Sequence, residues 1–150
     1  MKFMFNGAVT LGTLDGANIE ILERVGRDNI CIFGLTAEQV MDYYLSGGYL
    51  AFDECKNDAR LKRLTEQLVD GTFAAAGGDF WGIYDPLLRN NDEYFVLKDF
   101  GAYLAAWQQV AGWYQQPDLW RQMAVTNVAK AGYFSSDRTI REYAQDIWHL

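Results

Sequence analysis

Residues 8–34 read AVTLGTLDGANIEILERVGRDNICIFG and contain the pattern that decides the fold. The short apolar run at 8–13 lies between two turns that contain glycine, which predicts a strand. A helix is expected next, with Asn18 as its N-cap and Gly26 at its end. Residues 30–33 then form a continuous apolar run, typical of a strand that is buried on both faces in a parallel sheet. Strand, helix and strand together predict a βαβ unit at about residues 8–34.

The rest of the chain, from about residue 36 to residue 148, has mainly helical periodicity. The spacing of Thr36 and Gln39 predicts a capping box at a helix start. Pro117 fits the first position of a later helix, where its missing N–H costs nothing, and Ser135 or Ser136 is expected to cap the last helix. The apolar faces expected to be buried are Phe100, Tyr103, Leu104, Trp107, Val110, Ala111 and Tyr114, then Leu119, Trp120, Met123 and Val128, and finally Ile140, Tyr143, Ala144, Ile147 and Trp148.

These patterns predict an α/β fold that is mostly helical with a small parallel sheet. Two strands do not form a stable sheet alone. Either residues 94–97 supply a further strand, or the other strands belong to sequence before residue 1, which is the alternative that we favour.

Composition excludes several classes of function. Half of the residues are apolar and 15% are aromatic, as in a folded globular protein. The formal net charge of −7 argues against nucleic acid and against an anionic membrane surface as partners. No stretch approaches the roughly 18 apolar residues that a membrane span needs, and no signal sequence is visible, so a cytoplasmic location is expected. Cys31 and Cys55 are 24 positions apart and His149 is the only histidine, so no metal site is predicted.

Few residues point to chemistry by themselves. The glycines near the start do not form a nucleotide-binding fingerprint, because the strand that should precede it is absent. Asp15 and Glu20 are better explained by a tight turn and by the first turn of a helix than as a catalytic carboxylate pair. The aromatic residues at helical spacing favour a core over a platform for sugars. Taken alone, Lys2 is a charge on the surface.

A resemblance to a known family makes Lys2 a candidate functional residue. Residues 1–21, MKFMFNGAVTLGTLDGANIEI, closely resemble the pyridoxal-phosphate attachment region of the glycogen and α-glucan (maltodextrin) phosphorylases. The resemblance continues through residues 32–34, and residues 132–148 are similar to the carboxyl-terminal signature of that family. It covers the whole chain, most weakly between about Leu45 and Tyr94, and Phe5 and Val9 are conservative departures.

The resemblance implies a two-lobed enzyme of the GT-B type, in which residues 1–150 are a single carboxyl-terminal portion of the second Rossmann-like lobe. In that family the lysine that matches Lys2 forms the Schiff base with pyridoxal phosphate. Inorganic phosphate attacks the terminal α-1,4-linked glucose of a glucan and releases glucose 1-phosphate, and the cofactor's own phosphate exchanges a proton with the substrate phosphate. Lys2 is then a cofactor anchor, and no residue of this chain is expected to be catalytic.

Because the matching lysine lies inside a much longer chain in the family, we expect this chain to be a carboxyl-terminal fragment that is inactive by itself. A different hypothesis is a folded interaction domain without catalysis, which pairs with an amino-terminal portion or forms a homo-oligomer to cover its exposed sheet edge. A third is a glycosyltransferase of the glycogen-synthase type, which uses a sugar nucleotide and no pyridoxal phosphate. The motif around Lys2 argues against it.

Overall fold

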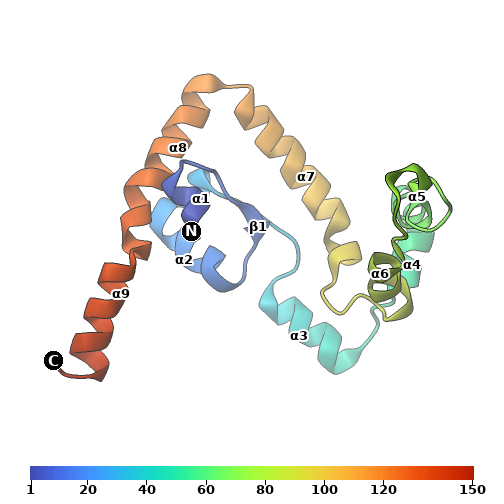
Figure 1. Cartoon of the computed structure of the whole chain (residues 1–150), viewed down its shortest axis with the longest axis horizontal. Coiled ribbons are helices and arrows are strands. Elements are labelled where there is room, and N and C mark those ends of the chain that lie inside the picture. Colours follow the sequence, from blue (N-terminus) through green and yellow to red (C-terminus); the bar gives the residue numbers. More distant parts are fainter. The chain divides into compact units, whose positions relative to one another are not determined.

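The computed structural model describes residues 1–150, apart from the side chain of Ala76. The chain divides into two compact units (Figure 1). The first contains residues 1–33 and 105–150, and the second contains residues 34–104. Within the part of the chain that is described, no helix is both long enough and apolar enough to cross a membrane.

The first unit contains the predicted strand–helix–strand arrangement. Strand β1 (Leu11–Thr13) pairs in parallel with β2 (Cys31–Phe33), and α2 (Gly16–Val25) connects them. A 3-10 turn, Arg27–Asn29, leads from α2 into β2. These are the two strands of the small sheet within the described residues, so the prediction of a mostly helical chain with a small parallel sheet is confirmed.

The start of α2 differs from the prediction. The helix begins at Gly16, so Asp15 occupies the N-cap position and Asn18 lies inside the first turn. Asn18 turns back instead, and its Nδ2 donates to the backbone oxygen of Thr13 at 2.9 Å. The prediction of Asn18 as the N-cap was wrong because an asparagine side chain also bonds to nearby backbone from other positions. Gly26 does end the helix, as expected.

Three further helices complete the first unit. They are α1 (Lys2–Phe5), α8 (Pro117–Ala131) and α9 (Ser136–Glu142), together with the second half of α7 (Val96–Tyr114). A 3-10 turn (Gly132–Phe134) precedes α9, and a π-helical turn (Tyr143–Ile147) follows it. Figure 1 shows α1 and α2 beside α8, and the core between them consists of Met4, Ile21, Val25, Ile30 and Ala131.

The described residues of the second unit form helices joined by loops, without a strand. Its helices are α3 (Ala37–Ser46), α4 (Ala51–Asn57), α5 (Ala59–Gln67) and α6 (Trp81–Tyr84), with a π-helical turn at Asp85–Arg89, a 3-10 turn at Ala74–Ala76 and the first half of α7. The capping box of Thr36 and Gln39 is confirmed at the start of α3. Pro117 at the first turn of α8 and Ser135 as the cap of α9 are confirmed in the first unit.

A hydrogen-bonded loop holds the core of the second unit together. Asp92 is buried, and its Oδ2 accepts from the Tyr49 hydroxyl at 2.8 Å and from the Leu97 backbone N–H at 2.7 Å. Asn91 bonds to the backbone of Tyr49 and of Ala51. This bonding places the loop before α7 against the start of α4. The further strand considered at residues 94–97 does not form, because a turn precedes α7 and the helix begins at Val96.

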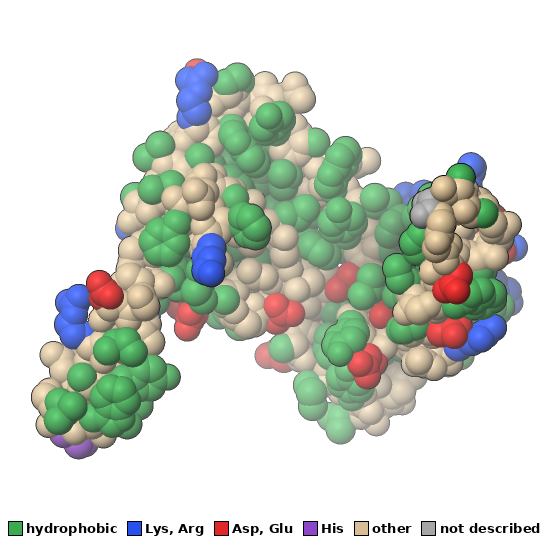
Figure 2. All heavy atoms as spheres, viewed as in Figure 1, with side chains coloured by type: hydrophobic (Ala, Val, Ile, Leu, Met, Phe, Trp, Pro, Cys, Tyr) green, Lys and Arg blue, Asp and Glu red, His purple; other side chains and the backbone are tan. Residues whose placement is uncertain are grey.

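Burial of the helices near the carboxyl end is the main disagreement with the sequence analysis. Ile140, Ile147 and Trp148 are each more than half exposed, although they were expected to be buried. Figure 2 shows hydrophobic side chains gathered on this terminal helix. Trp107 on α7 and Val128 on α8 are likewise 54% and 46% exposed. Periodicity identified the apolar faces, but it does not show how far neighbouring elements cover them. Met123 on α8 is 1% exposed, as expected, whereas the described residues leave the face of Ile140, Ile147 and Trp148 largely uncovered.

Candidate functional site

The amino-terminal segment places Lys2 on a short helix that is fixed to the core at one residue. Met4 is 1% exposed and belongs to the core of the first unit, with Ile21 and Ala131. Lys2 is exposed, and its backbone oxygen accepts from Asn6 Nδ2 at 2.9 Å. The buried Met4 therefore holds the helix in place, while the Lys2 side chain extends toward solvent.

A tight turn follows the helix and passes close to α8. Gly7 has a φ of +79°, a conformation that favours glycine, and its N–H donates to the Met4 oxygen at 3.0 Å. A Cβ atom at this position would lie 3.4 Å from the Cβ of Ala124 on α8. The glycine thus allows both the turn and the close approach of α8, which together set the direction in which α1 leaves the core.

The Lys2 ammonium group has no ion-pair partner within 4.0 Å among the described residues. An exposed primary amine that is free of a carboxylate can reach a carbonyl compound in solution and react with it. The Lys2 amine is therefore accessible for the Schiff base that the resemblance implies.

Asp15, one of the two residues considered as a carboxylate pair with Glu20, has a structural role in a turn. Asp15 Oδ2 accepts from the Thr13 hydroxyl at 3.1 Å, which braces the turn after β1. Asn18 braces the same turn from the other side, and a Cβ atom on Gly12 would lie only 2.7 Å from Asn18 Nδ2. Glu20 is exposed on α2. These contacts support the assignment of Asp15 to a tight turn.

One cluster in the first unit escaped the sequence analysis. The guanidinium carbon of Arg24 lies 3.5 Å from the centroid of the Tyr133 ring, and that of Arg138 lies 3.7 Å from it. Arg138 also donates to the Tyr133 backbone oxygen and pairs with Glu142. The spacing of Arg138 and Glu142 could have predicted their ion pair, but no local signal connects Arg24 with Tyr133.

This cluster connects two segments that are far apart in the sequence. Arg24 lies in the last turn of α2, and Tyr133 and Arg138 lie in the segment 132–148. Contacts around Met4 also join α1 to Ala131 at the end of α8. The segments with the strongest family resemblance, at the two ends of the chain, therefore pack together in one unit.

Other kinds of site find less support in the structure. Among the described residues, no group of three or more histidine, cysteine or acidic side chains is arranged to hold a metal ion. Cys31 is 3% exposed and lies near the backbone of Ala106, and burial raises the pKa of its thiol. Its burial agrees with the buried strand that the apolar run at residues 30–33 predicts.

Comparison with known proteins identifies the class. The family model described as carbohydrate phosphorylase matches residues 1–150, and the chain belongs to that family. It is 51% identical over 150 residues to the glycogen phosphorylase of Bacillus subtilis, which the chain covers to 19% of its length. It is 43% identical over 152 residues to the maltodextrin phosphorylase of Streptococcus pneumoniae, and 39% identical over 148 residues to the muscle form of glycogen phosphorylase of Oryctolagus cuniculus.

All or nearly all of this chain is covered in each of these comparisons, at 100%, 100% and 99%. In contrast, the chain covers only 19%, 20% and 17% of the lengths of these relatives. The chain is thus about a fifth as long as the relatives that it matches.

Proposed function

We propose that residues 1–150 are the carboxyl-terminal portion of the second Rossmann-like lobe of a GT-B-type glycogen or α-glucan phosphorylase. The family match over the whole chain supports this proposal, as does the parallel βαβ unit. The whole protein would cleave α-1,4-glucan with inorganic phosphate and release glucose 1-phosphate in the cytoplasm.

Within that enzyme, Lys2 would hold pyridoxal phosphate through its Nζ atom. The resemblance of residues 1–21 to the pyridoxal-phosphate attachment region carries this assignment, and it is supported by an exposed Lys2 amine on a helix fixed by the buried Met4. When bound, the cofactor supplies a phosphate group that exchanges a proton with the substrate phosphate. Lys2 itself would bind and orient the cofactor, and the short helix and the turn at Gly7 keep the Lys2 backbone in place.

Reductive trapping tests the role of Lys2 on the chain as it stands. The 150-residue protein is incubated with pyridoxal phosphate and reduced with borohydride, and the modified residue is located by peptide fragmentation in a mass spectrometer. We expect more label at Lys2 than at Lys56, Lys62 or Lys130, because Lys2 alone is proposed to belong to a cofactor site. The yield will be low, since the groups that would bind the cofactor phosphate lie elsewhere in the enzyme.

Lys2→Arg is the matched control, because it keeps the positive charge and the neighbouring terminal amine while it removes the reactive amine. Label that persists on the first peptide of this variant belongs to the terminal amine of Met1. An even distribution over the surface lysines of the unmodified chain would count against a special role for Lys2.

A second candidate is a folded assembly domain without catalytic activity of its own. The observation that favours it is the exposed apolar face of the terminal helix, where Ile140, Tyr143 and Ile147 are 57%, 45% and 58% exposed. Exposed apolar faces of this kind mark contact surfaces. The partner would be the remainder of a phosphorylase chain or a second copy of this one.

A further inference from the structure

A cavity lies wholly within the second unit, at a site that the proposed function does not use. It has a volume of about 320 Å³, which is near the lower end of the range of about 300–1,000 Å³ for small-molecule sites. Helices α4 and α5 and the segment that contains α6 and the following π-helical turn enclose it. Its lining residues are Phe52, Cys55, Lys56, Lys62, Thr65, Glu66, Tyr84 and Leu88.

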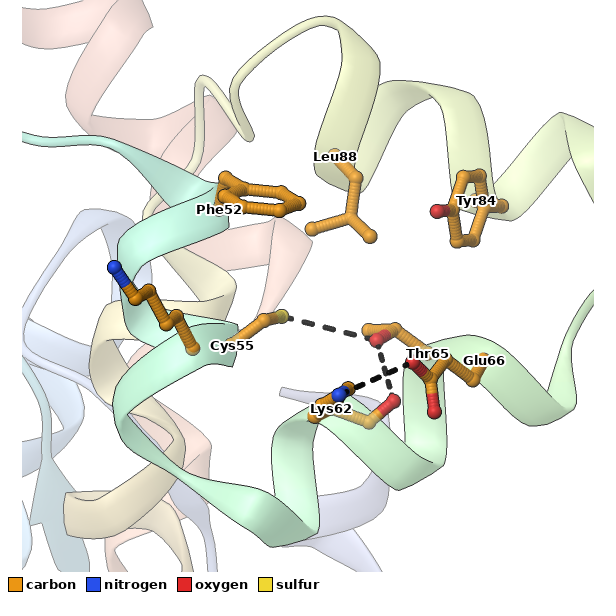
Figure 3. Close-up of a pocket in the computed structure, with 8 residues that line it drawn as sticks. Phe52, Cys55, Lys62, Thr65, Glu66, Tyr84 and Leu88 are labelled. Carbon is orange, nitrogen blue, oxygen red and sulfur yellow. Dashed lines mark hydrogen bonds and ion pairs between the residues drawn. The ribbon is translucent and has the colours of Figure 1, made fainter.

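The cavity has two unlike sides (Figure 3). Phe52, Leu88 and Tyr84 lie along one side, and Cys55 and Thr65 lie opposite them, with no labelled side chain between the two rows. Phe52 is 69% exposed although it lines a cavity, so its ring offers apolar surface that the described chain leaves uncovered.

The floor of the cavity is polar in composition, but its hydrogen bonds are already made. The Thr65 hydroxyl donates to the Leu61 backbone oxygen at 2.9 Å, and Cys55 Sγ lies 3.7 Å from Thr65 Oγ1. Burial raises the pKa of the Cys55 thiol, so neither Cys55 nor Thr65 carries a charge at neutral pH. A sugar would find few unpaired groups here for its hydroxyls, whereas an apolar body fits against this floor.

Charge at the cavity favours an anion. The lining has two lysines and one glutamate, in a chain whose formal net charge is −7. Glu66 pairs with Lys62 at 3.8 Å. Lys56 is exposed and has no ion-pair partner within 4.0 Å among the described side chains. One ammonium group at the cavity is therefore available to a negatively charged ligand.

We propose that this cavity binds a small amphipathic carboxylate, with an aromatic or short alkyl body between the side that carries Phe52 and Leu88 and the side that carries Cys55 and Thr65, and with its carboxylate at Lys56. The proposal concerns a binding site in residues 34–104 and does not depend on the role of Lys2. The ligand must be small because the cavity volume is about 320 Å³. It carries a single negative charge because Lys56 is the one lysine of the cavity lining without an ion-pair partner among the described residues.

Three probes with the same body separate the apolar contribution from the charge. They are 4-phenylbutyrate, the neutral 4-phenylbutan-1-ol and the cationic 4-phenylbutylamine, each titrated into the ¹⁵N-labelled 150-residue chain and followed by NMR. We expect saturable shifts at the cavity residues with 4-phenylbutyrate, with a Kd on the order of 1 mM for so small a ligand. The alcohol should bind about two- to fivefold more weakly, because an exposed ion pair contributes little, and the amine more weakly still.

Two variants with matched controls locate the ligand. Lys56→Gln should remove the preference for the carboxylate over the alcohol, whereas Lys130→Gln on α8 should leave it unchanged. Phe52→Ala should weaken the binding of both probes, whereas Phe3→Ala removes an even more exposed ring elsewhere, 82% against 69%, and should have no effect. All four side chains are exposed, so the fold should survive each change, which circular dichroism checks.

Either of two results would overturn the proposal. One is the absence of saturable shifts at the cavity residues up to the solubility limit of 4-phenylbutyrate. The other is binding that is the same in Phe52→Ala and Lys56→Gln as in the unmodified chain, or that spreads over exposed apolar residues of both units, since the probe would then be partitioning onto apolar surface in general.

Discussion

At the scale of single residues, Gly34 and Asp99 determine how the chain leaves β2. Gly34 has a φ of +82°, and a Cβ atom placed on it would overlap the Asp99 carboxylate. Asp99 Oδ1 accepts from the Leu35 N–H at 2.8 Å. Burial raises the pKa of the Asp99 carboxyl, and the hydrogen bond from Leu35 opposes that rise. The position thus requires glycine both for its backbone and for the carboxylate beside it.

Gly34→Ala is therefore expected to lower the free energy of unfolding by about 2–4 kcal/mol. The estimate combines about 1–2 kcal/mol for a side chain in a left-handed conformation with about 1–2 kcal/mol for the displaced Asp99 hydrogen bond. Urea denaturation of the variant and of the unmodified chain measures the difference.

Gly77→Ala provides the control for backbone strain alone. Gly77 has a similar φ of +76° in the left-handed conformation, but nothing lies within 4 Å of the position that its Cβ would take. This substitution should cost about 1–2 kcal/mol. Equal losses for the two variants would show that the Asp99 carboxylate moves aside freely, and would contradict the packing argument.

At the scale of elements, the terminal helix presents an apolar face that no other element covers within the described residues. Ile140, Tyr143 and Ile147 recur at intervals of three and four residues, so they share one face of the helix. In water such a face favours association with another apolar surface.

We expect the isolated chain to self-associate through this face as its concentration rises. The double substitution Ile140→Lys and Ile147→Lys should shift the protein toward the monomer in analytical sedimentation. Leu45→Lys on α3 is the control, because Leu45 is 81% exposed and lies outside the proposed face. A chain that sediments as a compact monomer at every concentration would rule out self-association as the role of this face.

Elements were predictable where the signal is local. Thr36 with Gln39, Gly26, Pro117 and Ser135 begin or end helices through contacts within a few residues, and these predictions are confirmed. The prediction for Asn18 failed because α2 begins at Gly16, and the Asn18 side chain bonds back to the Thr13 backbone oxygen from inside the first turn.

Burial and the binding sites depend on contacts between distant residues, which no local pattern contains. Ile140 and Ile147 share one apolar helix face, as their spacing predicts, but the spacing does not show whether another element covers that face. The cavity beside Phe52 was not predicted because its walls come from three helical segments. The importance of Lys2 came from resemblance to a family, since its spacing and composition alone indicate only a surface charge.

At the scale of the whole molecule, the chain is about a fifth as long as its phosphorylase relatives. Phosphorolysis in the proposed enzyme would need charged groups from both lobes held in place around the phosphate. The isolated 150-residue chain is therefore expected to release no glucose 1-phosphate from glycogen or maltodextrin in the presence of inorganic phosphate.

A coupled assay for glucose 1-phosphate, with the protein preincubated with pyridoxal phosphate, measures this activity. The full-length glycogen phosphorylase of Bacillus subtilis, 51% identical over the shared region, serves as the positive control. Turnover by the isolated chain above the background without enzyme would contradict the expectation and would place catalytic groups within these residues.

The first unit is assembled from two separated segments, and this bears on the order in which the protein folds during synthesis. Residues 34–104 are contiguous, so their core can close as soon as they leave the ribosome. Met4 must wait for Ala131, its neighbour in the core, which is translated 127 residues later. Within these 150 residues, the helix that carries Lys2 is therefore translated before residues 34–104 but fixed in place after them, and until then its apolar residues are open to chaperones and to other nascent chains.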